Sequence, residues 1–302
     1  MKYLLKLLAP GISLLLVASS TFAQTPAACT ITFFTSPTAG DVLFPQGINR
    51  FGNIVGFHQN PAHPEIGSRA FVRFSNGTFG SCCKIAGLNT NTTLVASKRN
   101  ASGVVVGRYE DNNFTTFHGF VSSGSQTVTF DYPGAELTNL FGINSFGSLV
   151  GTRVPKPPRT LPFIGFVWKN GTFRDVQFGT TATNPTSIND SGVIVGWHQV
   201  GTNPHGFVLS GGAFHDVLVP GSSSTLVNDI NNAGVMVGTF NTGHGVQSFV
   251  LKNGAFQDVV VPGARDVEVF GINGFNVLTG FANFPNSSGT VTTRAFLARC
   301  SL

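Results

Sequence analysis

Short runs of β-branched and aromatic residues recur along the whole chain, and Gly, Asn, Pro and Ser separate them. Residues 193–197 (Val-Ile-Val-Gly-Trp) form one such run, and residues 225–230 form another. Runs of this length and composition predict β-strands, and the residues between them predict turns. The pattern therefore predicts an all-β protein built from many short strands.

One motif sets the spacing of these runs. It consists of an apolar residue, Asn, two variable residues, Gly, a short apolar run and a closing Gly, as in residues 188–196. The motif occurs six times, 42 to 51 residues apart, with Arg99 in place of the apolar residue in the second copy and Asn276 in place of the first glycine in the sixth. The closing glycine always lies seven residues after the asparagine. A strand-rich repeat of this length predicts a β-propeller with one blade per repeat. The motif asparagines are Asn49, Asn100, Asn144, Asn189, Asn231 and Asn273.

Each repeat contains four predicted strands, which we name A to D. In the fourth repeat they cover residues 193–197, 206–209, 214–219 and 225–230. A Gly-Gly or Asn-Gly pair, such as Asn170-Gly171, separates B from C and favours the type I′ turn of an antiparallel hairpin. A Pro-Gly pair, such as Pro220-Gly221, separates C from D. We therefore expect a four-stranded antiparallel meander, A to D, in every blade.

The two ends of the chain complete the ring. The last repeat stops after a B-like run at residues 295–299, whereas the chain begins with a C-like run at 30–34 and a D-like run at 42–48. Strands from both termini therefore build the last blade, which leaves no open sheet edge. The predicted architecture is a six-bladed β-propeller of four-stranded blades, a single domain over residues 24–302.

The four cysteines allow three pairings. Cys29 precedes the first strand of the shared blade and Cys300 follows its last one, so the topology predicts a Cys29–Cys300 disulfide that locks the ring. Cys82 and Cys83 are adjacent in sequence, and they are either free thiols or a vicinal disulfide.

Residues 1–23 have the pattern of a secretory signal peptide, with Lys2 and Lys6 before an apolar stretch and small residues up to Ala23. We therefore expect a secreted protein, extracellular or periplasmic, and no other stretch is apolar enough to span a membrane. Charged residues make up 10% of the chain and the net charge of +5 is not gathered in blocks. Nucleic-acid binding is therefore not expected, and we expect a monomer.

The tripeptides His118-Gly119-Phe120 and His205-Gly206-Phe207, together with the motif copy at residues 229–238, resemble the HAF repeat of bacterial extracellular proteins, named after its His-Ala-Phe tripeptide. The resemblance covers nearly the whole chain after residue 23, although four repeats lack the histidine. It implies a secreted, propeller-like repeat protein without an established activity, and it supplies no catalytic residue.

The expected meander has two faces. The A–B and C–D loops lie on one face, which we call the A–B face. The tight B–C and D–A turns lie on the other, which we call the D–A face. The six motif asparagines lie in the D–A turns, where we expect them to be structural and to hydrogen-bond their own turn backbone. Aspartates that recur after the aromatic residue of strand C are also interpreted as structural; these are Asp131, Asp175, Asp216 and Asp258.

The A–B face is the predicted ligand-binding face, because its loops of 8 to about 14 residues vary and variable loops on a rigid frame often carry binding sites. Two matched triplets lie there, Phe57-His58-Gln59 and Trp197-His198-Gln199. Such triplets could stack on and hydrogen-bond a sugar, or they reflect only the common origin of the repeats. The predicted ligand-binding residues are Phe57, His58, Arg108, Trp197 and His198. Six of the seven histidines lie on this face: His58, His63, His118, His198, His205 and His244.

Catalytic signatures are absent from the sequence, which has no Gly-x-Ser-x-Gly elbow, His-Glu-x-x-His motif or Gly-rich phosphate loop. Glu110-Asp111 is the only acidic pair on the A–B face, and adjacent carboxylates rarely reach the separation of about 5–10 Å that a glycosidase needs. No His or Cys set has zinc-ligand spacing, so neither a metal nor another cofactor is expected. The sequence favours a binding module for a glycan or protein; a carbohydrate-active hydrolase or lyase using the A–B face, and a purely structural repeat protein, stay open as alternatives.

Overall fold

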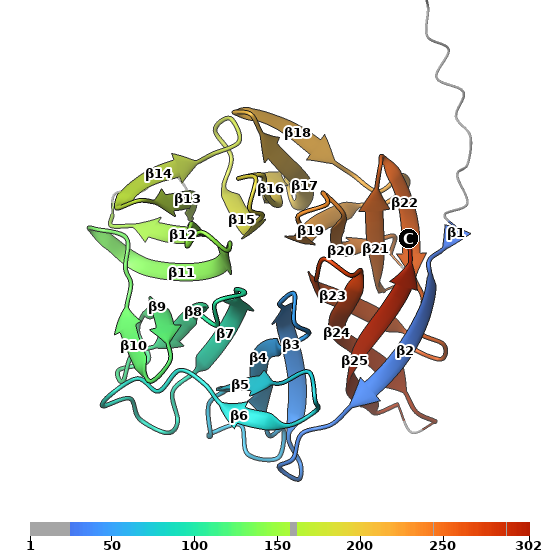
Figure 1. Ribbon diagram of the computed structural model, residues 1–302, viewed down its shortest axis with the longest axis horizontal. Helices are drawn as coiled ribbons and strands as arrows, with labels where there is room; N and C mark the ends of the chain where they lie inside the picture. Colours follow the sequence, from blue (N-terminus) through green and yellow to red (C-terminus); the bar gives the residue numbers. More distant parts are fainter. Residues whose placement is uncertain (1–24, 158–161, 244, 288) are drawn as a thin grey trace, which may run out of the picture.

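The computed structural model describes residues 25–157, 162–243, 245–287 and 289–302. These residues form six sheets that stand as blades around a central axis (Figure 1), so the protein is a six-bladed β-propeller and the predicted fold class is confirmed. The predicted signal peptide, residues 1–23, lies outside the described residues. In the part of the chain that is described, no helix is long and apolar enough to cross a membrane.

Three blades come from the first half of the chain. Blade 1 contains β3 (Val42–Ile48), β4 (Ile54–Gln59), β5 (Arg69–Arg73) and β6 (Phe79–Ser81). Blade 2 contains β7 (Leu94–Arg99), β8 (Val105–Glu110), β9 (Phe117–Ser123) and β10 (Gln126–Thr129). Blade 3 contains β11 (Ala135–Ile143), β12 (Leu149–Pro155), β13 (Ile164–Lys169) and β14 (Thr172–Val176).

The second half completes the ring. Blade 4 contains β15 (Thr183–Ile188), β16 (Ile194–Val200), β17 (Asn203–Ser210) and β18 (Ala213–Val217). Blade 5 contains β19 (Ser224–Ile230), β20 (Met236–Asn241), β21 (Val246–Lys252) and β22 (Ala255–Val259), with β1 (Thr25–Pro26) added in parallel at its edge. Blade 6 contains β23 (Asp266–Ile272), β24 (Val277–Pro285), β25 (Val291–Ser301) and β2 (Ala28–Phe34).

Each blade is offset by one strand from the sequence repeat. In blade 4 the order is β15-β16-β17-β18, so strand D of the third repeat is innermost and strands A, B and C of the fourth repeat follow outwards. The expectation that A to D of one repeat pair as one meander is therefore wrong at the C–D step. The chain leaves the outer edge of a blade and crosses back to the axis (Figure 1). In sequence, the Pro-Gly break at this crossover looks the same as a turn between paired strands.

The ring closes through a blade that both termini build, as expected. β2 is the outermost strand of blade 6 and pairs with β25, whereas β3 begins blade 1. The N-terminus thus contributes one strand to the shared blade, and not the two that the shifted repeat suggested. Cys29 and Cys300 lie opposite each other in this pairing and are joined by a disulfide, with Cα atoms 4.1 Å apart. Cys82 and Cys83 form a second, vicinal disulfide.

Packing inside the blade requires the closing glycine of each motif. The glycine lies opposite the buried phenylalanine of the next strand, as Gly238 lies opposite Phe249. A Cβ atom at Gly238 would lie 2.0 Å from the Leu226 carbonyl oxygen and 2.7 Å from Phe249 Cζ. Atoms do not approach so closely, and the packed interior has no spare volume. Any larger residue at this position therefore disrupts the pairing of the two inner strands.

The six motif asparagines form a closed belt around the D–A end of the axis. Each is buried and caps its own turn; Asn231 Oδ1, for example, accepts hydrogen bonds from the N–H groups of Ala233 and Val235, both at 3.0 Å. Each amide nitrogen also donates to the backbone carbonyl of the next motif asparagine, and Asn273 Nδ2 closes the circle by donating to Asn49 O at 3.3 Å. The asparagines therefore connect all six blades, a role that a single repeat does not reveal.

A buried ion pair crosses the axis close to this belt. Lys98 on β7 of blade 2 donates to Asp229 on β19 of blade 5, which lies on the opposite side of the ring. Asp229 is 1% exposed, and it also accepts hydrogen bonds from Ser187 Oγ at 2.6 Å and the Ile272 N–H at 2.8 Å. A buried carboxylate needs such partners to remain charged. The pair therefore links opposite blades at the D–A end.

Candidate functional site

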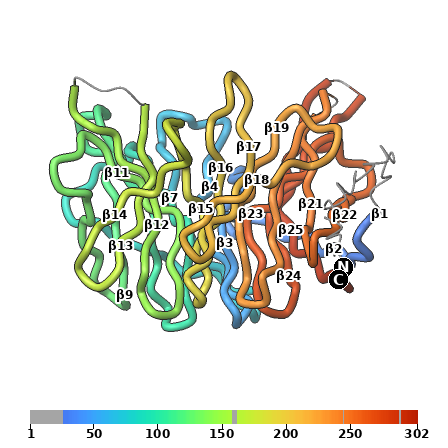
Figure 2. Tube along the Cα trace, turned by 90° about the horizontal axis from the view of Figure 1, so that it is seen from above, coloured from blue at the N-terminus to red at the C-terminus, as the bar shows by residue number. Residues whose placement is uncertain are grey.

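The A–B loop of blade 4 is shorter than predicted. In blade 4, β16 and β17 stay paired as far as Val200 and Asn203, and only Gly201 and Thr202 join them. The sequence pattern placed the strand ends at residues 197 and 206, so the predicted loop is a continuation of the hairpin. Figure 2 shows that the hairpins end at two opposite rims of the ring, which are the A–B and D–A faces. His198 and His205 consequently lie on paired strands and not on a loop.

The predicted residues of blade 1 have close neighbours. Phe57 stacks on Phe44 of the adjacent strand, with ring centroids 4.9 Å apart. His58 Nδ1 lies 2.6 Å from Asp41 Oδ2, and His58 also lines a depression of about 770 Å³ together with Arg69. Both rings are half-buried, so a part of each is left for a ligand to contact.

Arg108 and Trp197 occupy separate places on the same face. The Arg108 guanidinium lies 5.8 and 6.0 Å from the ring centroids of Phe117 and Phe141, and burial lowers its pKa. Trp197 packs edge-on against Phe163, with ring centroids 5.5 Å apart. The predicted ligand-binding residues thus pack against separate sets of neighbours, and they do not form one cluster. His244, counted with the histidines of this face, lies outside the described residues.

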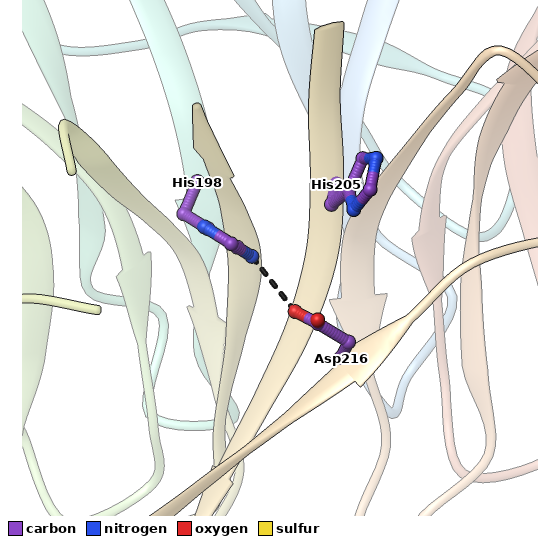
Figure 3. A group of neighbouring side chains, drawn as sticks. All are labelled: His198, His205 and Asp216. Atoms are coloured by element: carbon purple, nitrogen blue, oxygen red, sulfur yellow. Dashed lines mark hydrogen bonds and ion pairs between the residues drawn. The ribbon is translucent and has the colours of Figure 1, made fainter. Parts of the chain in front are cut away.

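Blade 4 carries a cluster of two histidines and a carboxylate (Figure 3). His198 on β16, His205 on β17 and Asp216 on β18 each offer one ligand atom, and these atoms lie within 4.8 Å of one another. His198 and His205 are directly opposed in the hairpin, and His198 Nε2 lies 2.8 Å from Asp216 Oδ1. Three adjacent strands therefore bring three groups that could hold a metal ion into one small volume.

His198 is the rigid member of this cluster. Its ring is 3% exposed and stacks on Phe178 with centroids 3.9 Å apart. His198 Nδ1 lies 3.4 Å from Thr181 Oγ1, while the Thr181 hydroxyl donates to the Phe178 carbonyl at 2.8 Å. The carboxylate of Asp216 can only accept, so its closer contact at 2.8 Å is a hydrogen bond when His198 Nε2 carries a proton. These contacts hold the imidazole ring in one orientation.

The sequence predicts His198 as a binding residue but does not predict its two partners. The pattern places His205 on a loop, and the recurrence of an aspartate in each repeat favours a structural role for Asp216. A signal for the pair was present, since His198 and His205 are equally distant from Gly201-Thr202 and a two-residue turn would oppose them.

Other blades use the same positions for different contacts. In blade 3, Arg153 takes the place of His198 and donates two hydrogen bonds to Asp175, at 3.2 and 2.8 Å. In blade 2, Tyr109 takes that place, and its hydroxyl lies 2.8 Å from Thr129 Oγ1. Among the described residues, blade 4 alone combines two imidazoles and a carboxylate at this distance.

Both carboxylates of the acidic pair on the A–B face accept hydrogen bonds. The Glu110 carboxylate accepts a hydrogen bond from the Thr93 N–H at 3.3 Å. Hydrogen bonds from the Thr115 N–H and hydroxyl help to lower the pKa of Asp111, with the backbone contact the stronger cause. A general acid at neutral pH needs a raised pKa instead. Asp111 is therefore poorly suited to the role of proton donor.

Glu268 on the innermost strand β23 behaves differently. Burial, and next the negative charge of Asp266, raise the pKa of Glu268. Asp266 is itself held by Arg265, whose Nη2 lies 2.8 Å from Asp266 Oδ2. A raised pKa is a property of many catalytic acids, but structural burial produces it as well. Burial also raises the pKa of Asp258, so Glu268 is one of two carboxyl groups that a test of catalysis should address.

Exposed phenylalanines surround the belt on the D–A face. Phe51, Phe146 and Phe275 lie two residues after a motif asparagine, and they are 52%, 77% and 77% exposed. Phe146 lines two grooves, one of about 600 Å³ between blades 3 and 4 and one of about 420 Å³ between blades 2 and 3. The tight turns that the sequence predicts on this face therefore carry an apolar surface of the kind that often meets a partner.

No protein-family model matches the chain, and no curated protein matches it. Solved structures match it in fold. TolB from Acinetobacter baumannii has a TM-score of 0.55 at 12% identity, over 82% of this chain and 64% of that chain. A protein of unknown function from Dyadobacter fermentans has a TM-score of 0.54 at 10% identity, over 90% and 99% of the two chains. A putative gluconolactonase has a TM-score of 0.52 at 14% identity, over 92% and 94%. Identities this low show a shared propeller fold alone, and membership of the HAF-repeat family stays a prediction.

Proposed function

We propose that the protein is an exported binding module whose ligand, a glycan, contacts the A–B face around Trp197. The observation that carries the proposal is an unmet hydrogen-bond acceptor beside this ring. Asn184 on β15 is the cross-strand partner of Trp197, and Asn184 Oδ1 is buried without a hydrogen-bond partner. An acceptor without a donor is costly, and because Oδ1 is buried, the half-buried Asn184 amide must rotate before a hydroxyl group of a ligand, or a water, can supply the donor.

A second amide strengthens the same interpretation. Asn139 on β11 holds the equivalent position in the neighbouring blade 3, and its Oδ1 is likewise buried without a partner. The half-buried ring of Trp197 and the adjoining Phe163 provide the apolar surface on which a sugar ring stacks. Aromatic surface with a few amide groups and no charge is typical of a neutral, polyhydroxylated ligand.

Export is the other part of the proposal. The disulfides Cys29–Cys300 and Cys82–Cys83 persist in oxidising compartments and are rare in the cytosol. This agrees with the predicted signal peptide, and we propose an extracellular or periplasmic location. Fractionation of cells that express the full chain tests the location, because a processed protein found only in the cytosol would contradict it.

A glycan array tests the binding proposal. We expect the mature protein to bind a limited set of glycans, and Trp197→Ala to lose this binding with an unchanged circular-dichroism spectrum. His215→Ala is the matched control, since His215 is exposed on the outermost strand β18, two strands away from Trp197 on β16, and should bind as the wild type does. Wild-type protein that binds no glycan, or Trp197→Ala that binds normally, would refute the proposal.

A protein partner on the D–A face is the second candidate, and the exposed Phe146 and Phe275 favour it. A photo-crosslinking residue at position 146 should then capture one discrete partner in the secreting organism. The matched control is position 114, because Phe114 is also exposed but lies on an A–B loop. Equal capture at both positions would indicate nonspecific contact.

A further inference from the structure

We propose that His198, His205 and Asp216 bind a divalent transition-metal ion, such as Zn²⁺, on blade 4. The proposal is separate from the glycan contact, because Trp197 and His198 are consecutive residues of β16 and their side chains point to opposite sides of the strand. The cluster has the donor atoms, the geometry and the supporting contacts of a metal site.

The donor atoms select the class of metal. Two imidazole nitrogens and one carboxylate oxygen suit Zn²⁺ and neighbouring first-row ions, whereas Ca²⁺ and Mg²⁺ prefer sites made of oxygen atoms. A set of two histidines and one carboxylate leaves a further coordination position for water or a ligand group. Asp216 is 54% exposed, so that position can open towards solvent.

The spacing is close to that of a bound ion. Zinc bonds of about 2.0–2.2 Å in a tetrahedral arrangement place neighbouring ligand atoms about 3.4 Å apart. His198 Nε2 and Asp216 Oδ1 are 2.8 Å apart, and all three ligand atoms lie within 4.8 Å. A shift of about 1 Å by the exposed Asp216 and the half-buried His205 completes the set.

The contact between His198 Nε2 and Asp216 Oδ1 can hold either a proton or a metal ion. These two atoms are 2.8 Å apart, and a metal ion that displaces the proton of Nε2 binds both of them. Within the described residues, His205 forms no hydrogen bond, so both of its ring nitrogens are available. A metal ion satisfies the three groups together.

Contacts behind His198 resemble the outer shell of known metal sites. A ligating histidine usually donates its other N–H to an oxygen atom, which fixes the ring and the tautomer. Thr181 Oγ1 lies 3.4 Å from His198 Nδ1, and Phe178 stacks on the ring. One ligand of the set is therefore already oriented before an ion binds.

Blade 2 provides an internal control. His118 Nδ1 lies 2.7 Å from Asp131 Oδ2, so this blade also has a histidine–aspartate pair. Tyr109 stands opposite His118 in the place that His198 takes in blade 4, with ring centroids 5.2 Å apart. Without a second imidazole this pair should not retain a metal ion.

Isothermal titration of the tag-free mature protein with ZnCl₂ tests the proposal. We expect one zinc ion per chain, and at least about tenfold weaker binding in His205→Ala and in Asp216→Asn. Both substituted side chains are at least partly accessible, and His118→Ala should bind as the wild type does. The proposal is wrong if the wild type binds no zinc, if His205→Ala binds it equally well, or if His118→Ala removes the site. No glycan is present in this experiment, so its outcome is distinguishable from a failure of the glycan proposal.

Discussion

Replacing one asparagine of the belt measures how strongly the belt holds the ring together. Asn231→Ala removes the acceptor of the Ala233 and Val235 N–H groups and the donor to Asn273 O. Ala233 is exposed, so water replaces one bond, and Asn273 O still accepts from the Asn276 N–H at 3.2 Å. The Val235 N–H is left buried without a partner.

One buried, unpaired N–H group costs about 1–3 kcal/mol, and we expect Asn231→Ala to lower the free energy of unfolding by this amount. Urea unfolding followed by fluorescence measures the loss, with an unchanged slope as the sign that the native state is intact. The control is Asn76→Ala, because Asn76 caps an exposed B–C turn and should cost no more than about 0.5 kcal/mol. Equal losses in the two variants would show that the buried belt does not stabilise the ring.

Three further outcomes follow from the fold. Gly238→Ala should destabilise the protein by about 3 kcal/mol or more, because its Cβ would meet the Leu226 carbonyl, while Gly274→Ala, with no atom within 4 Å, should be neutral in thermal unfolding. Cys29→Ser should cost about 2–5 kcal/mol, and mass mapping of non-reduced peptides that joined Cys29 to Cys82 or Cys83 would contradict the closed ring. Burial raises the pKa of Glu268, so the folded state holds this proton more tightly than the unfolded state. The free energy of unfolding therefore falls as the pH rises from the pKa of the unfolded state, about 4.3, towards the higher pKa of the folded state. Glu268→Gln should therefore raise the melting temperature at neutral pH and leave it unchanged in acid; an equal shift at both would argue against the raised pKa.

The sequence predicts the fold well because the repeated residues are ones that favour particular local backbone conformations. The motif asparagine, the two glycines and the Asn-Gly turns each serve one position of a hairpin, so their spacing indicates strands, turns and the number of blades. The sequence does not predict the one-strand offset between blade and repeat, because this offset depends on which strands pair in the folded protein. Pro220-Gly221 marks a break in the chain, but only the sheet shows that β18 and β19 belong to different blades.

The candidate site was less predictable for the same reason. Trp197 and His198 stand out in the sequence because they belong to one of the two matched triplets. Their side chains lie on opposite sides of β16, and the sequence does not show which residues contact each of them. Asn184 on β15 meets Trp197, and Asp216 on β18 meets His198, only through strand pairing. Asp216 also resembles Asp175, which holds the same position in blade 3. The two aspartates differ in their partners, because Asp216 contacts His198 whereas Asp175 accepts hydrogen bonds from Arg153.

Hydrogen–deuterium exchange with and without the best array glycan tests most directly whether the A–B face of blade 4 is the binding surface. Backbone amides of residues 182–184 and 197–205 should exchange more slowly in the complex, because the ligand covers the β16–β17 hairpin and the adjoining inner strand. Protection confined to the D–A turns, at residues 144–148 and 189–193, with no change in residues 197–205, would contradict the account and place the ligand on the opposite face.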